Sequence, residues 1–253
     1  MLRRASGAEE GAADLVDLSF RALMADIPDL AKTELAIVER TNVFRREQGL
    51  GVVRRDPVLD RAARNFARYL AKSGRFAHEA DGRKPADRVK EAGYWFCAIA
   101  ENLALNLDSR GFTVEKLARD TVEGWKASPG HRKNMLLPYV TEIGVGVAQA
   151  PTSEPKFLSV QLLARPNSLS YELQVTNKST TSVSYSFGGK NHDVPARSII
   201  THRACEPGKI TFTHAGGWFG GETLNAQFSV SGTASFVLQK GSDGKIRIED
   251  NRR

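Results

Sequence analysis

The chain has 253 residues, of which 41% are hydrophobic, so it is long enough for one large domain or two modest ones. Its net charge of +7 is distributed over both halves, and no block of basic residues interleaved with aromatics indicates nucleic-acid binding. No apolar run approaches the length of a transmembrane segment, and the first residues lack the apolar core of a signal peptide.

Apolar residues at helical spacing dominate the first part of the sequence. Residues 1–30 predict an arm or a short leading helix, and the first long helix is expected over 33–48. Asp56 before Pro57 is typical of a helix start, and Gly74 provides a left-handed stop for that helix. Two further helices are expected at 85–93 and 113–126.

Strands are expected in the rest of the chain. The first two cover 140–148 and 157–163, and in the first of them Gly144 and Gly146 form a small face that allows close packing against the backbone. The composition changes at Pro166-Asn167. The short segments after this point alternate apolar and polar residues, and Gly, Asn and Ser residues separate one segment from the next. We therefore predict an all-β, sandwich-like accessory domain after the boundary. The expected domains are 31–166 and 167–253.

Two histidines and a glutamate are candidates for a functional cleft. His78 lies in a polar segment after a predicted helix, and His131 follows the next long helix on a turn that begins at Ser128. Glu101 lies between them in the sequence. Spacing leaves two interpretations open: the three residues converge on one cleft, or each histidine makes only local hydrogen bonds and Glu101 caps a helix or lies at a rim.

A series of short motifs appears in order over about half of the chain. They are Asn42-Val-Phe-Arg45, Phe76-Ala-His78, Asp81-Gly-Arg-Lys-Pro85-Ala-Asp-Arg88, Ala92-Gly-Tyr94, Ala100-Glu-Asn-Leu-Ala104, Trp125 with Ser128-Pro-Gly-His131-Arg, and Glu142-Ile-Gly-Val-Gly-Val-Ala148. Through these motifs the segment from about 35 to 165 resembles the CAP superfamily of cysteine-rich secretory, antigen 5 and pathogenesis-related proteins, in its short bacterial form, the SCP domain.

The resemblance implies a fold and a cleft. The expected fold class is α+β: an α-β-α sandwich with a small, mainly antiparallel sheet, followed by the all-β domain. The family's cleft histidines fall on His78 and His131, and its first glutamate on Glu101. The family's second glutamate often stands three residues after the helix tryptophan, where this chain has Ser128, whereas Glu123 lies elsewhere on the helix.

Two kinds of chemistry fit these residues. Two neutral imidazoles with a nearby carboxylate are suited to Zn²⁺ with an open position for water, so His78 and His131 are candidate ligands with Glu101 close by. Alternatively, Ser128, His131 and Glu101 have the residue types of a serine hydrolase, or a metal-bound water attacks the substrate. We expect a binding function more than catalysis, and a vestigial cleft with the β domain as the interaction surface is the third alternative.

The cysteines and the resemblance bear on the compartment. Cys97 and Cys205 are too few for a disulfide scaffold, and either a bridge between the two domains or two buried free thiols would account for them. The resemblance implies a secreted or periplasmic protein. Its partner would be a small molecule, a lipid-like molecule or an envelope component.

Overall fold

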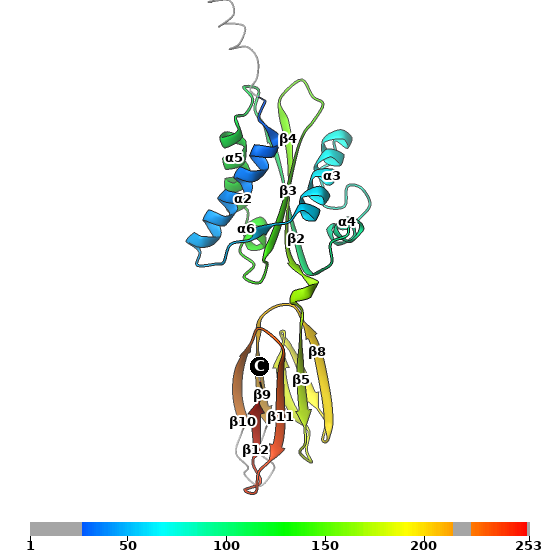
Figure 1. Ribbon diagram of the computed structural model, residues 1–253, viewed down its shortest axis with the longest axis vertical. Helices are drawn as coiled ribbons and strands as arrows, with labels where there is room; N and C mark the ends of the chain where they lie inside the picture. The colour runs from blue at the N-terminus through cyan, green and yellow to red at the C-terminus, as the bar shows by residue number, and fades with distance from the viewer. Residues whose placement is uncertain (1–26, 215–223, 252–253) are drawn as a thin grey trace, which may run out of the picture. The chain divides into compact units, whose positions relative to one another are not determined.

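The computed structural model describes residues 27–214 and 224–251, and these form two compact units (Figure 1). The first unit extends to Tyr94 and continues from Ile99 to Ala164. The second consists of Trp95–Ala98 and the chain from Arg165 onward. The predicted boundary is at 166–167, whereas the second unit resumes at Arg165, and the sequence did not indicate that four residues near position 95 join the second unit. Most of the predicted arm, 1–30, lies outside the described residues.

Five helices build the described part of the first unit. Their bounds are α2 Leu30–Glu47, α3 Pro57–Ser73, α4 Pro85–Glu91, α5 Val114–Ala127 and α6 Pro129–Met135. The Asp56 side chain accepts hydrogen bonds from the Val58 and Leu59 amides, and Gly74 ends the same helix at φ 70°. No helix among the described residues is both long and apolar enough to cross a membrane.

The sheet of the first unit has the strand order β1-β3-β4-β2. Its strands are β1 Arg54–Arg55, β2 Phe96–Leu107, β3 Glu142–Gln149 and β4 Lys156–Pro166. β3 pairs with β4 in antiparallel register and with the short β1 in parallel. Figure 1 shows α2, α5 and α6 on one face of the sheet and α3 and α4 on the other. This arrangement confirms the predicted α-β-α sandwich.

The small face of β3 explains how closely α3 approaches the sheet. A Cβ atom added at Gly144 would lie 2.3 Å from the carbonyl carbon of Leu59, and one added at Gly146 would lie 2.2 Å from the amide nitrogen of Arg64. Both distances are shorter than any tolerated van der Waals contact. The two glycines therefore allow the helix backbone to rest directly on the strand.

The second unit is a sandwich of two four-stranded sheets. Their orders are β10-β9-β6-β7 and β12-β11-β5-β8. The strands are β5 Tyr171–Asn177, β6 Val183–Phe187, β7 Lys190–Val194, β8 Ser198–Ala204, β9 Gly208–His214, β10 Leu224–Val230, β11 Ala234–Lys240 and β12 Ile246–Asp250. Side chains from both sheets share one core, in which the rings of Phe212 and Phe236 pack 5.5 Å apart. The predicted all-β domain is confirmed.

A disulfide joins Cys97 to Cys205. Both cysteines belong to the second unit, because Trp95–Ala98 is grouped with the chain after Arg165. Of the two alternatives, the cysteines are thus paired with each other and are not free thiols, and the bridge lies within the second unit and not between the two units. The sequence misplaced Cys97 because the strand that carries it was not predicted.

A histidine pair lies between β7 and β8, each the last strand of its sheet. The ring centres of His192 and His202 are 4.6 Å apart, and Nε2 of His202 is 2.6 Å from the Tyr185 hydroxyl. Burial lowers the pKa of His202, and the charge of His192 lowers it further. An unfolded chain takes up this proton at about pH 6.5. We therefore expect the free energy of unfolding of the second unit to decrease as the pH falls below about 6.5, and to level off below the folded-state pKa.

The His202→Gln variant tests this expectation. Urea unfolding of the second unit at about pH 7.5 and about pH 5.5 should show a smaller loss of stability on acidification in the variant than in the wild type. An equal loss in both proteins would show that His202 does not govern the acid sensitivity.

Candidate functional site

The His78–Glu101 pair is the centre of the candidate site. His78 lies on a turn after α3, and Glu101 lies on β2 with a side chain that is only 2% exposed. Nδ1 of His78 is 2.8 Å from Oε1 of Glu101. Because a carboxylate offers only acceptor atoms, Nδ1 carries the proton in this contact. In the neutral ring, Nε2 of His78 is then the atom with a free lone pair.

Arg88 on α4 holds this pair in place. Its Nη2 donates to Oε2 of Glu101 at 2.8 Å and to the carbonyl oxygen of His78 at 2.9 Å. Its Nη1 donates to Asp81 at 2.9 Å and to the carbonyl oxygen of Arg83 at 2.8 Å. All four Nη hydrogens are thus used within the His78 loop and on Glu101.

His131 lies on α6, the short helix for which the sequence analysis predicted only a turn. Its imidazole is half-buried; burial lowers its pKa, and the charge of His78 lowers it further. The lowered pKa favours the unprotonated ring, which can donate a lone pair.

A buried polar network ties α6 to the sheet. The Asn102 amide nitrogen donates to the carbonyl oxygen of His131 at 3.2 Å and to the Gln161 side chain at 2.9 Å, and Gln161 donates to the Thr41 hydroxyl at 3.0 Å. Asn134 on α6 donates to the carbonyl oxygen of Glu101 and to Asn102. This network fixes the helix that carries His131 next to the strand that carries Glu101.

The other candidate residues take no part in these contacts. Ser128 caps α6 with its backbone, and among the described residues no hydrogen bond joins its hydroxyl to His131. Glu101 contacts His78 and Arg88 instead of His131, so Ser128, His131 and Glu101 do not form a connected triad. Glu123 pairs with Lys126 at the surface.

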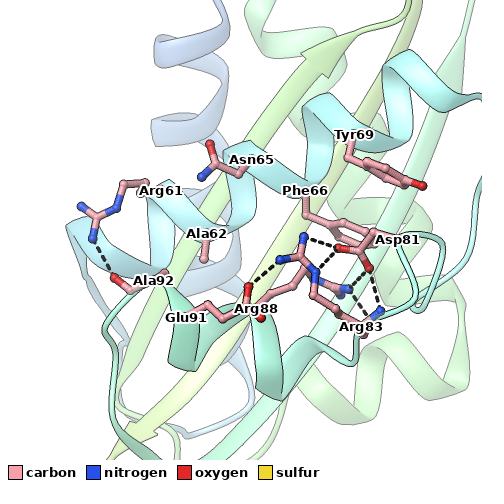
Figure 2. Close-up of a pocket in the computed structure, with 10 residues that line it drawn as sticks. All are labelled: Arg61, Ala62, Asn65, Phe66, Tyr69, Asp81, Arg83, Arg88, Glu91 and Ala92. Atoms are coloured by element: carbon pink, nitrogen blue, oxygen red, sulfur yellow. Dashed lines mark hydrogen bonds and ion pairs between the residues drawn. The ribbon is translucent and has the colours of Figure 1, made fainter.

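A cavity of about 330 Å³ lies between α3 and α4, and Arg88 is one of the residues that line it (Figure 2). Arg61, Asn65 and Tyr69 line it from α3, and Arg83 closes it through ion pairs with Asp81 and Glu91. The guanidinium carbon of Arg88 stacks 3.5 Å from the centre of the Phe66 ring at its base. The cavity is polar, and two of its three arginines, Arg83 and Arg88, form ion pairs with acidic neighbours.

The side chains around His78 and His131 decide whether a metal ion could bind here. Within the described ranges, no group of three or more His, Cys, Asp or Glu side chains is arranged to hold a metal. Glu101 already contacts Arg88 with one oxygen and His78 with the other, so it is placed to orient His78 and not to bind a metal itself. Of the three predicted residues, the imidazoles of His78 and His131 are thus left as candidate ligands, fewer than the three protein ligands usual in a zinc site with an open position.

Arg88 and the short helix α6 were not predicted from the sequence. Ser128 followed by Pro129 is a helix-start signal of the same kind as Asp56-Pro57, and it could have predicted α6. Arg88 stands in one of the motifs, but no local pattern indicates that its partners come from a turn, a loop and a strand.

The fold is an α-β-α sandwich, and in it the strand residue Glu101 is hydrogen-bonded to the loop residue His78. Residues 38–162 match the model of the Cysteine-rich secretory protein family, CAP. This part of the chain is therefore a CAP domain, as its motifs predicted.

Two proteins of Bacillus subtilis strain 168 are related in sequence. YkwD is 32% identical over 118 residues, which are 46% of this chain and 43% of that protein. The membrane protein YlbC is 32% identical over 116 residues, 46% of this chain and 31% of that protein. The chain thus matches less than half the length of either relative.

Solved structures show lower similarity. An extracellular SCP-domain protein from Bacillus anthracis aligns with 23% identity and a TM-score of 0.45, over 54% of this chain and 41% of that one. An outer surface protein from Borrelia burgdorferi aligns with 19% identity and a TM-score of 0.48, over 57% of this chain and 100% of that one. The family assignment rests on the sequence match and not on these two values.

Proposed function

We propose that the protein is an exported, envelope-associated or secreted binding protein whose His78–His131 cleft takes a divalent metal ion, with Zn²⁺ as the preferred one. The observation that carries the proposal is the Glu101–His78 hydrogen bond of 2.8 Å. Carboxylates that accept the second ring N–H of a histidine are the usual outer partners of zinc ligands. The lowered pKa of His131 supports the same conclusion, because only unprotonated imidazole binds metal.

Export is supported by the disulfide. Disulfides form and persist in oxidising compartments and are rare in reducing ones. The Cys97–Cys205 bridge therefore favours a periplasmic or extracellular location, in agreement with the secretory character in the family's name. The ligand presented to a bound metal would be a small molecule or an envelope component.

Calorimetric titration with Zn²⁺ tests the proposal. The wild type should bind one equivalent, and the His78→Ala/His131→Ala variant should lose that binding. Affinity should also decrease below about pH 6, because protonated imidazole does not bind metal. The matched control is His192→Gln/His202→Gln, which removes two imidazoles from the second unit and should leave the affinity unchanged.

Two outcomes would contradict the proposal. Equal affinity in the wild type and in the His78/His131 variant would place the metal elsewhere. Loss of binding in the control would place it in the second unit.

A further inference from the structure

The Arg88 side chain donates hydrogen bonds to both members of the His78–Glu101 pair. A single nitrogen, Nη2, donates to the Glu101 carboxylate and to the His78 backbone. The side chain of Arg88 is 6% exposed and that of Glu101 is 2% exposed, so water does not compete for these hydrogen bonds. The position of the histidine ring therefore depends on the guanidinium through its backbone and through its carboxylate partner.

The same guanidinium also shapes the loop that carries His78. Nη1 bonds to Asp81 and to the carbonyl oxygen of Arg83, so the segment from 78 to 83 bends around one planar group. The Phe66 ring holds the flat face of Arg88, with the guanidinium carbon 3.5 Å from the ring centre (Figure 2). A lysine could keep the charge but not four directed hydrogen bonds and a stacked plane.

We propose that Arg88 is the positioning residue of the site: it fixes Glu101 so that His78 is held in its Nδ1–H form, with Nε2 left free to bind a ligand. The inference rests on the proposed function in one respect, namely that the cleft binds a ligand at all. It also specifies the ligand's contacting atom. An exposed Nε2 lone pair binds an atom that accepts electrons, either a metal cation or the hydrogen of a donor group, and disfavours an anion.

The charges around Arg88 agree with this ligand class. Arg88 is neutralised by Glu101 and Asp81, and Arg83 by Asp81 and Glu91. Each of these two arginines therefore has two carboxylate partners, so neither is an unpaired cation that would attract an anionic ligand to His78.

The first test reads the ring of His78 directly. Nitrogen-15 NMR of ring-labelled wild-type protein at about pH 8 should show His78 protonated at Nδ1 and not at Nε2. The Arg88→Gln variant should show a mixture of the two forms, and Arg88→Lys should resemble Arg88→Gln. A merely structural role for Arg88 would leave the tautomer unchanged in any variant that folds. Because the wild-type spectrum needs no variant, an Nε2–H form there would overturn the proposal by itself.

The second test measures Zn²⁺ affinity in the same proteins. Loss of an outer partner of a metal ligand typically weakens affinity by about 10–100-fold, and we expect this decrease for Arg88→Gln and Arg88→Lys. Arg83→Gln is the matched control, since it removes an arginine from the same cluster without touching Glu101, and its affinity should stay within about twofold. Unchanged affinity in both Arg88 variants, with the His78 tautomer also unchanged, would overturn the inference.

The two readouts keep the proposals separate. If the wild type binds no Zn²⁺ but Arg88 still controls the His78 tautomer, the metal function fails and the positioning role stands. If Zn²⁺ binds and the tautomer does not depend on Arg88, the positioning role fails and the metal function stands.

Discussion

Replacement of Trp125 by alanine is expected to lower the free energy of unfolding of the first unit by about 3–5 kcal/mol. Trp125 on α5 is 1% exposed and belongs to the same core cluster as Leu117 and Val122. Its Nε1 donates to the carbonyl oxygen of Leu103 on β2 at 2.9 Å. The substitution therefore leaves a large cavity and a buried carbonyl group without its partner.

Urea unfolding followed by circular dichroism measures this loss. The matched control is Trp95→Ala, since Trp95 is 71% exposed and its removal should change stability by less than about 0.5 kcal/mol. An unfolding midpoint of Trp125→Ala equal to that of the wild type would contradict the burial of this side chain.

Loss of the disulfide is the second change with a large expected effect. Cys97 and Cys205 are 108 residues apart in sequence, and in the chain-entropy model closing a loop of this length stabilises the folded state by about 4–5 kcal/mol. The double variant Cys97→Ser/Cys205→Ser should therefore unfold its second unit at markedly lower urea concentration. The first unit should change little, because both cysteines belong to the second unit.

A reductant provides the control for the disulfide. Dithiothreitol should lower the stability of the wild-type second unit to that of the double variant, and it should have no effect on the variant itself. A wild-type transition that does not respond to reductant would contradict a stabilising role for the bridge.

The helices could be predicted from the sequence because their signals are local. The Asp56-Pro57 start and the Gly74 stop are set by neighbouring residues, and both appear in the structure. The strand β2 could not be predicted in this way. It is half-buried from Phe96 to Ala100, buried from Glu101 to Leu103 and alternating only beyond, so its side chains show no single period.

The candidate site was only partly accessible from the sequence. The family resemblance singled out His78, Glu101 and His131, and the structure places Glu101 directly on His78. The roles of these residues depend on tertiary contacts. Arg88 donates a hydrogen bond to Glu101, thirteen residues away in the sequence, and Asn102 donates one to the backbone of His131, twenty-nine residues away. No periodicity or capping rule encodes such contacts, because the partners lie on different elements that only the tertiary fold brings together.

An anomalous difference map at the zinc edge, from crystals of protein purified without chelator and supplied with one equivalent of Zn²⁺, tests the central claim most directly. We predict one peak within about 2.0–2.1 Å of Nε2 of His78 and of a ring nitrogen of His131, with Glu101 hydrogen-bonded to His78 and outside the coordination sphere. A map without a peak at this pair, or with a peak bound by other residues, would contradict the account.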